Sequence, residues 1–253
     1  MTRFTGRTAC VTGGAGGIGT AICERLASEG ASVAVVDVGD AGAEAVAKQL
    51  AADHGVDAFA IVADLSTKAG GDRMIELVLE RWSRIDVLVN NAGGGVIRPT
   101  LEHTEETMRA TIDRNLWTTI WCTVGVIPAM LEQGYGRVVN VGGESVRNGL
   151  YEHAIYNAAK GGVHAICTAL AREFSAQGIT FNTVAPSIVL TDAVRSALAS
   201  SPDHSFHRAV NLIPMGRPAA EDEVASAVAY LSSEEAAFIT GQVLSLNGGS
   251  SMG

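Results

Sequence analysis

The chain is short of cysteine and of basic residues, and each shortage removes classes of function. Its four cysteines are far apart, with no Cys-x-x-Cys pair and no Cys/His spacing that suits zinc. We therefore expect buried thiols in a reducing compartment and no metal site. Lys and Arg number 18 against 27 Asp and Glu and form no basic cluster, which argues against nucleic acid and anionic membranes as partners.

Long hydrophobic runs are also missing. No apolar stretch reaches the roughly 18 residues that a membrane span needs, and the start, MTRFTGRTACVTGG, has no apolar signal core. We therefore expect a cytoplasmic protein without a membrane segment. Of the 253 residues, 47% are hydrophobic, which is enough to build one large core.

Short β-branched runs alternate with longer Ala-rich stretches along the whole chain. This alternation predicts an α/β protein: a single Rossmann-type, doubly wound parallel sheet of about seven strands with helices on both faces, forming one domain over residues 1–253. The segment 187–215 lacks clear periodicity, so we expect it to be a lid over a substrate site. The expected strands are 8–12, 32–38, 57–62, 87–90, 137–141, 180–184 and 242–245, and the expected helices are 18–29, 41–53, 68–83, 104–133, 154–177 and 221–232.

A glycine-rich turn, Gly13-Gly14-Ala15-Gly16-Gly17-Ile18-Gly19, follows the first expected strand and opens the first expected helix. Glycines let a pyrophosphate approach the backbone N–H groups, and the positive end of the helix dipole favours the anion. This context predicts a dinucleotide site. Asp37 ends the second strand, 18 residues after Gly19, where a carboxylate binds ribose hydroxyls and repels an extra phosphate. The expected cofactor is NAD.

Four segments together resemble the short-chain dehydrogenase/reductase family: the glycine turn, Asp64-Leu65, Asn90-Asn91-Ala92-Gly93 and Tyr156-x-x-x-Lys160. The resemblance covers essentially the whole chain. It implies that Asp64 and Leu65 hold the adenine, while Asn91, Ala92 and Gly93 line the adenosine ribose. It also implies that the nicotinamide carboxamide is held by Pro186, Val189 and Thr191. The full expected cofactor set is Gly13, Gly17, Ile18, Gly19, Asp37, Asp64, Leu65, Asn91, Ala92, Gly93, Tyr156, Lys160, Pro186, Val189 and Thr191.

Tyr156 and Lys160 are four residues apart and so share one face of the expected helix. A free phenol titrates near pH ~10, and an adjacent ammonium together with a cationic nicotinamide favours phenolate, the form that acts as a general base. The family resemblance gives Asn115 the role of bending its helix, so that a neighbouring carbonyl holds a proton-relaying water. The expected catalytic residues are therefore Tyr156, Lys160 and Asn115.

One position departs from the family. The family places a serine thirteen residues before the tyrosine, and this chain has Gly143 there. A lost hydrogen-bond donor of this kind costs about 3–4 kcal/mol of transition-state stabilisation. Ser145 is the first substitute, provided that the chain curls back at Gly142 and Gly143. The alternatives are Glu144, His153 and Asn157, or no replacement.

The expected function is an NAD-dependent oxidoreductase that interconverts a secondary alcohol and a ketone by hydride transfer. The small-molecule substrate would be an alicyclic or aromatic alcohol or a 3-hydroxyacyl-CoA thioester. The alternative is a catalytically impaired NAD-binding subunit of a hetero-oligomeric dehydrogenase, which the glycine at position 143 motivates. The family resemblance further implies a homotetramer built on residues 104–133, 154–177 and 242–245.

Overall fold

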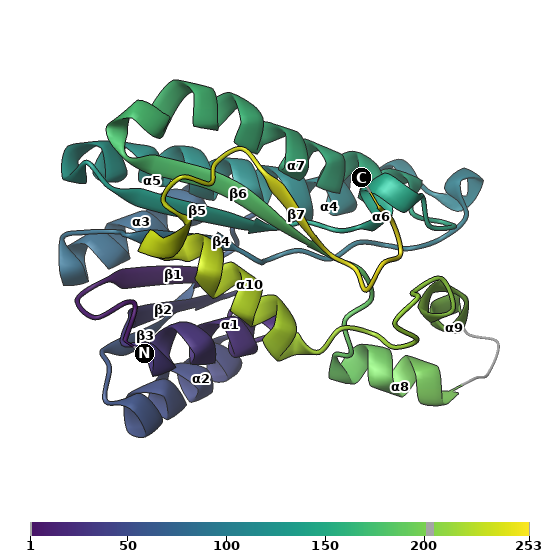
Figure 1. The fold of residues 1–253 in the computed structure, drawn as a ribbon, viewed down its shortest axis with the longest axis horizontal. Helices are drawn as coiled ribbons and strands as arrows, with labels where there is room; N and C mark the ends of the chain where they lie inside the picture. The colour runs from purple at the N-terminus through teal and green to yellow at the C-terminus, as the bar shows by residue number, and fades with distance from the viewer. Residues whose placement is uncertain (1, 201–204, 253) are drawn as a thin grey trace.

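The computed structural model describes residues 2–200 and 205–252. In this part of the chain, seven parallel strands form one sheet in the order β3-β2-β1-β4-β5-β6-β7 (Figure 1). The predicted α/β fold with a Rossmann-type sheet is thereby confirmed. The strands are β1 (Thr8–Thr12), β2 (Ser32–Asp37), β3 (Ala58–Val62), β4 (Val87–Asn90), β5 (Gly136–Val141), β6 (Ile179–Pro186) and β7 (Val243–Leu246).

Helices cover both faces of the sheet (Figure 1). The β2 residues alternate between two cores: Val33 and Val35 belong to the cluster on one face, and Ala34 and Val36 to the cluster on the other. None of the described helices has both the length and the apolarity that a membrane crossing requires. The first face carries α1 (Gly17–Ser28), α2 (Asp40–His54) and α10 (Glu221–Ser232), and the second carries α3 (Lys68–Trp82), α4 (Glu105–Ile112), α5 (Thr118–Gln133) and α7 (Ala154–Phe174).

The expected helix 104–133 is interrupted, because α4 and α5 are joined by a π-helical turn, η2 (Asp113–Trp117). The expected lid is also more regular than predicted: it contains α8 (Asp192–Ser200) and α9 (Ser205–Val210), while positions 201–204 lie outside the described residues. Short helices such as these carry too few turns to give a clear period. The remaining elements are η1 (Thr100–Glu102), α6 (Ser145–Asn148), η3 (Ser175–Gln177) and η4 (Glu234–Ala236).

The strand order reverses between β1 and β4, and this reversal positions the functional site. The chain runs outward from β1 through β2 to β3, then returns to place β4 on the other side of β1. Loops leaving β1 and β4 therefore diverge and leave a crevice at the carboxyl edge of the sheet, where ligands bind in folds of this class. Asp37, Asn90, Val141 and Pro186 all lie at this edge, because each is the last residue of its strand.

Candidate active site

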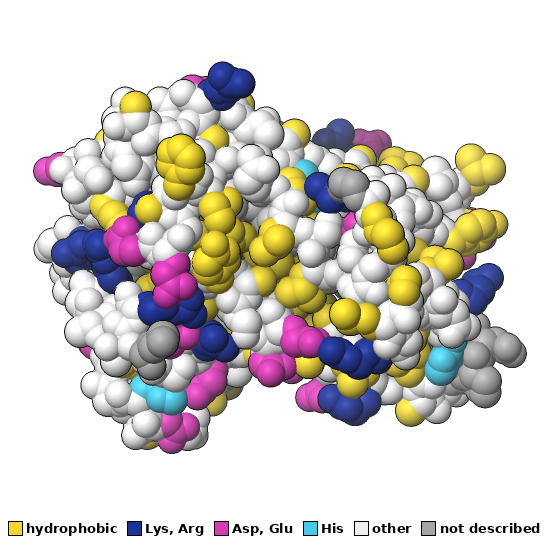
Figure 2. Space-filling model, in the orientation of Figure 1, with side chains coloured by type: hydrophobic (Ala, Val, Ile, Leu, Met, Phe, Trp, Pro, Cys, Tyr) yellow, Lys and Arg dark blue, Asp and Glu magenta, His cyan; other side chains and the backbone are white. Residues whose placement is uncertain are grey.

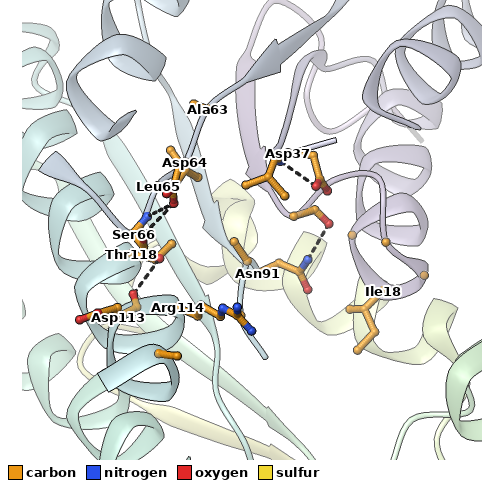
Figure 3. Close-up of a pocket in the computed structure, with 18 of the residues that line it drawn as sticks. Ile18, Asp37, Ala63, Asp64, Leu65, Ser66, Asn91, Asp113, Arg114 and Thr118 are labelled. Carbon is orange, nitrogen blue, oxygen red and sulfur yellow. Dashed lines mark hydrogen bonds between the residues drawn. The ribbon is translucent and has the colours of Figure 1, made fainter. Parts of the chain in front are cut away.

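A cavity of about 790 Å³, which we call the crevice pocket, opens where the strand order reverses (Figure 3). Its walls come from the glycine turn, from the ends of β2, β3 and β4, and from η2. The structure therefore brings together residues that are far apart in the sequence. The expected cofactor residues that line this pocket are Gly13, Gly17, Ile18, Gly19, Asp37, Asp64, Leu65, Asn91, Ala92, Gly93 and Thr191.

The glycine turn leaves no room for side chains. Gly13 has a φ of +62°, and a Cβ built on it would lie 2.9 Å from the Cα of Ala92. A Cβ at Gly19 would overlap the carbonyl oxygen of Gly13, and one at Gly17 would overlap the carboxylate of Glu221. The glycines therefore allow close packing and bring the backbone at the start of α1 to the wall of the crevice pocket. Backbone N–H groups at the start of a helix are suited to binding a pyrophosphate.

Asp37 is held at the rim of the crevice pocket by backbone donors. Its Oδ2 accepts from the N–H of Ala15 at 3.1 Å, and its Oδ1 accepts from the N–H of Val38 at 2.8 Å and of Gly39 at 3.3 Å. Oδ1 already accepts two hydrogen bonds, whereas Oδ2 accepts one and has a further lone pair for a ligand hydroxyl. The carboxylate is therefore fixed in place and still able to bind a ribose.

The ends of β3 and β4 complete the crevice pocket. The Oδ1 of Asp64 accepts from the backbone N–H of Ser66 at 3.0 Å and from its hydroxyl at 2.6 Å. The side chain of Asn91 donates to the carbonyl oxygens of Thr12 and Gly13, at 3.1 and 3.0 Å, and so ties the end of β4 to the glycine turn. The turn and the strand ends consequently form one connected wall.

Three charged residues in or beside this pocket, Asp113, Arg114 and Glu221, were not predicted from the sequence. Arg114 extends from η2 into the pocket (Figure 3). Glu221, at the start of α10, places its carboxylate against Gly17, and burial together with the charge of Asp192 raises its pKa. The sequence signal available for Arg114 was its position directly before Asn115. No such signal existed for Glu221, because α10 is distant in the sequence from the other residues of the pocket.

A second cavity of about 560 Å³, the substrate chamber, adjoins the crevice pocket. Ile18, Asn91, Gly93 and Thr191 line both cavities, so the two are continuous. The remaining predicted site residues Ser145, Tyr156, Lys160, Pro186 and Val189 line the chamber, and so do the apolar residues Ile97, Leu150, Val194 and Ile213. A ligand in the crevice pocket can therefore contact a second molecule in the chamber.

Tyr156 and Lys160 project from α7 into the substrate chamber, and Lys160 lies close to Gly93, which lines both cavities. The Nζ of Lys160 donates to the carbonyl oxygen of Val141 at 2.8 Å and lies 5.9 Å from the centre of the Tyr156 ring. Burial raises the pKa of Tyr156 to about 12 and lowers the pKa of Lys160 to about 8. In the chain by itself the phenol thus keeps its proton, and ionising it requires further positive charge nearby.

Asn115 lies behind Gly93 rather than in either cavity. It is fully buried in η2, and its Nδ2 donates to the carbonyl oxygens of Gly94 and Thr111, both at 2.8 Å. A Cβ at Gly93 would lie 2.7 Å from the Oδ1 of Asn115 and 3.3 Å from the Nζ of Lys160. Asn115 therefore fixes the loop that passes beside the lysine.

The loop after β5 is held by a buried histidine of α7. The backbone N–H of Gly143 donates to the Nε2 of His164 at 3.2 Å, so this nitrogen carries no proton. Burial, and then the charge of Lys160, lower the pKa of His164 to about 4. A Cβ at Gly142 would overlap the His164 ring, whereas one at Gly143 would meet the Tyr156 hydroxyl oxygen at 3.5 Å, an ordinary contact.

Ser145 and the Tyr156 phenol both lie close to Gly143, because the chain curls after this residue. The N–H of Glu144 donates to the carbonyl oxygen of Pro186 at 2.9 Å, and α6 begins at Ser145. The Oγ of Ser145 is 3.7 Å from the position that a Cβ at Gly143 would take. Its hydroxyl donates to the Oδ1 of Asn157 at 2.6 Å, and the Nδ2 of Asn157 donates back to the Ser145 carbonyl oxygen at 2.8 Å.

The other residues considered for the position beside Tyr156 have different surroundings. Glu144 is 1% exposed, and its Oε1 accepts hydrogen bonds from the side chains of Asn247 and Ser251. His153 lines the chamber, with its ring perpendicular to the ring of Tyr156 and the ring centres 5.7 Å apart. Of these residues, His153 therefore borders the phenol ring directly.

The fold and the two continuous cavities define a dinucleotide-binding oxidoreductase, and the sequence comparison identifies its family. Residues 7–201 match the short chain dehydrogenase family, so the chain belongs to that family. Members of this family use NAD or NADP, and the related enzymes named below oxidise or reduce alcohol and ketone groups.

Three similar proteins illustrate the range of the family. The chain is 52% identical, over 98% of its length and 95% of the relative, to 2,3-dihydroxy-2,3-dihydro-p-cumate dehydrogenase of Pseudomonas putida. It is 38% identical to acetoacetyl-CoA reductase of Allochromatium vinosum, covering 96% of this chain and 98% of the relative. The crystal structure of levodione reductase superimposes with a TM-score of 0.90 at 32% identity, with 98% of each chain covered.

Proposed function

We propose that the protein is an NAD-dependent dehydrogenase that interconverts a secondary alcohol and a ketone. The observation that carries this proposal is that Tyr156 and Lys160 line a chamber for a second molecule, and that this chamber shares wall residues with a pocket suited to a dinucleotide. Bound NAD would supply the hydride acceptor and a positive charge beside the phenol. Gly13, Gly17 and Gly19 let the backbone of the turn pack closely against neighbouring protein atoms, and this backbone lines the pocket where the pyrophosphate would bind.

In this proposal each residue of the site has a separate task. Tyr156 accepts the proton of the reacting hydroxyl as a general base. Lys160 lowers the pKa of the phenol and binds the ribose hydroxyls next to the nicotinamide. Asn115 orders the loop at Gly93 and Gly94 and thereby positions the lysine. Pro186, Val189 and Thr191 hold the carboxamide at the shared wall of the two cavities.

The preference for NAD over NADP rests on Asp37. Its carboxylate is fixed by three backbone N–H groups at the pocket rim. A fixed negative charge at this place binds the two ribose hydroxyls and repels a 2′-phosphate. Arg114 is part of the same pocket, but it projects from η2, whereas Asp37 ends β2 across the pocket (Figure 3).

In the proposed mechanism Gly143 occupies the place of the usual serine, no residue replaces that donor directly, and Ser145 is the polar side chain next to position 143. The short distances from one Cβ position, 3.5 Å to the Tyr156 hydroxyl and 3.7 Å to the Ser145 Oγ, support this assignment. To donate to the reacting oxygen, Ser145 must turn its proton away from Asn157, which leaves the amide oxygen of Asn157 without a donor.

An alicyclic secondary alcohol suits the substrate chamber better than a CoA thioester. Among the described residues that line it, Lys160 is the one Lys or Arg, and it is buried beside Val141. The phosphates of CoA would thus find little positive charge there. The relative with 52% identity is named for a ring that carries two hydroxyl groups, which favours the same choice. We place α8 and α9 as the lid of this chamber, since Val194 and Phe206 line it.

A homotetramer remains our proposal for the assembly. Figure 2 shows hydrophobic side chains gathered over the middle of the face that carries β7. Exposed apolar residues in this part of the chain include Tyr230, Phe238 and Leu244. Trp117, which is 40% exposed, stacks on Trp121 at the start of α5 with ring centres 4.9 Å apart. Association of copies through these surfaces would remove the apolar groups from water.

The proposal is tested by incubating the purified protein with NAD and a panel of alicyclic secondary alcohols at alkaline pH, with NADH absorbance as the readout. We expect NADH formation that depends on the alcohol and a loss of about a hundredfold or more in kcat in Tyr156→Phe. Full turnover of this variant, or no NADH from any alcohol, would show that the proposal is wrong.

A further inference from the structure

The hydrogen bonds around Ser145 determine which way its proton points. The Ser145 carbonyl oxygen can only accept, so the Asn157 group that contacts it at 2.8 Å must be the NH₂. The amide oxygen of Asn157 then faces the Ser145 hydroxyl at 2.6 Å and accepts its proton. Because Asn157 uses this proton, Ser145 offers lone pairs, not a donor, to the substrate chamber.

An acceptor beside Tyr156 has a consequence for the substrate. The reacting hydroxyl has one proton, and that proton goes to Tyr156 during oxidation. Ser145 therefore has no hydrogen to accept from the same hydroxyl. A ligand that satisfies both oxygens must bring a second donor close to the first.

His153 presents a second acceptor in the same chamber. Its Nδ1 lies 2.6 Å from the carbonyl oxygen of Tyr151, which can only accept, so Nδ1 carries the proton. In the neutral ring Nε2 is then unprotonated and has a free lone pair. The ring borders Tyr156 edge-on and lines the chamber.

We infer that the site recognises vicinal diols: the carbon next to the reacting one carries a second hydroxyl, whose proton is accepted by Ser145 or His153. Asn157 is a positioning residue, because it acts on the substrate only by holding the Ser145 proton. The inference rests on the proposed function and narrows its substrate class. Two acceptors line the same chamber as the phenol, and a mono-alcohol leaves both of them without a donor from the substrate, which costs binding free energy.

The test compares three substrates of the same ring: cis-cyclohexane-1,2-diol, its mono-methyl ether cis-2-methoxycyclohexanol, and cyclohexanol. The ether keeps the second oxygen but lacks its proton, so it separates hydrogen-bond donation from ring shape. We expect kcat/KM for the diol to exceed that for either other substrate by about tenfold or more. The readout is this ratio, measured with saturating NAD.

Variants of the enzyme then show which residues cause the diol-to-ether ratio of kcat/KM. We expect His153→Phe, which keeps an aromatic ring against Tyr156, and Asn157→Ala, which releases the Ser145 proton, each to lower the diol-to-ether ratio several-fold. His54→Phe is the matched control, because His54 lies on α2 and pairs with Glu24, away from the chamber. Its ratio should equal that of the unmodified protein.

The outcomes distinguish a failure of the diol inference from a failure of the proposed function. Equal kcat/KM for the diol and the ether overturns the inference and leaves the proposed function standing, since both are then oxidised. A ratio unaffected by either variant also overturns it. If none of the three alcohols reduces NAD or NADP, and wider screening finds no alcohol that does, the proposed function itself falls.

Discussion

The Nζ of Lys160 lies 5.9 Å from the centre of the Tyr156 ring and donates instead to the Val141 carbonyl oxygen. The two side chains are thus neighbours without a direct hydrogen bond. Burial acts on them in opposite directions: it raises the pKa of the phenol to about 12 and lowers the pKa of the ammonium to about 8. Burial therefore favours the neutral phenol, which ionises only when positive charge binds nearby, whereas Lys160 with a pKa of about 8 still carries its charge at pH 7.

Replacing Lys160 by Met should stabilise the fold and abolish activity. The folded pKa of about 8 is below the ordinary value, so keeping the charge at pH 7 costs stability, and stability rises as the pH goes from about 8 to about 10.5. We expect Lys160→Met to raise the free energy of unfolding at pH 7 by about 1–2 kcal/mol, after loss of the Val141 hydrogen bond. Urea unfolding checks this gain, and a less stable variant would contradict it.

His164 should make the fold sensitive to acid. Its pKa is lowered to about 4 in the folded chain. Between pH ~6.5 and ~4 the unfolded chain therefore binds a proton at this residue, and the folded chain does not. Stability is consequently lost as the pH falls through this range, by about 1–3 kcal/mol from this group. The measurement is the free energy of unfolding against pH for the unmodified chain and for His164→Asn. Identical slopes in the two proteins would rule out this contribution.

Asp37→Ser should change the cofactor preference. The substitution removes the charge that repels a 2′-phosphate and keeps a small polar side chain at the end of β2. We expect the ratio of kcat/KM for NAD to that for NADP to fall by about a hundredfold. Asp40→Ser, at the start of α2, is a control that also removes an acidic charge near this rim. An equal shift in the control would assign the effect to net charge alone.

Glu221→Gln should strengthen NAD binding. The Glu221 carboxylate lies against Gly17, where the pyrophosphate would approach, and its pKa is raised by burial. Removing this charge reduces repulsion, and we expect the Kd for NAD to fall by about three- to tenfold at low salt. Calorimetric titration measures the Kd, with Asp222→Asn as the control in the same helix turn. Weaker binding by Glu221→Gln would instead mean that the carboxylate contributes to the site.

The sequence predicted the sheet and most of the cofactor pocket because those features are local. Buried parallel strands appear as β-branched runs, and the glycine turn, Asp37 and the Tyr156–Lys160 pair each lie within one element. The proton on Ser145 depends on Asn157, twelve residues away, and the place of Gly143 depends on His164. Such contacts form between elements that only the tertiary fold brings together, so spacing in the sequence gave no sign of them.

The two adjacent glycines after β5 differ in how much change they tolerate. At Gly142 any larger residue must displace the His164 ring, so substitution there should be selected against. At Gly143 a methyl-sized group would make ordinary contacts with Tyr156. A serine at position 143 could therefore be accommodated by one substitution, without remodelling the surrounding loop. The backbone at position 143 thus tolerates either a glycine or a small side chain during evolution.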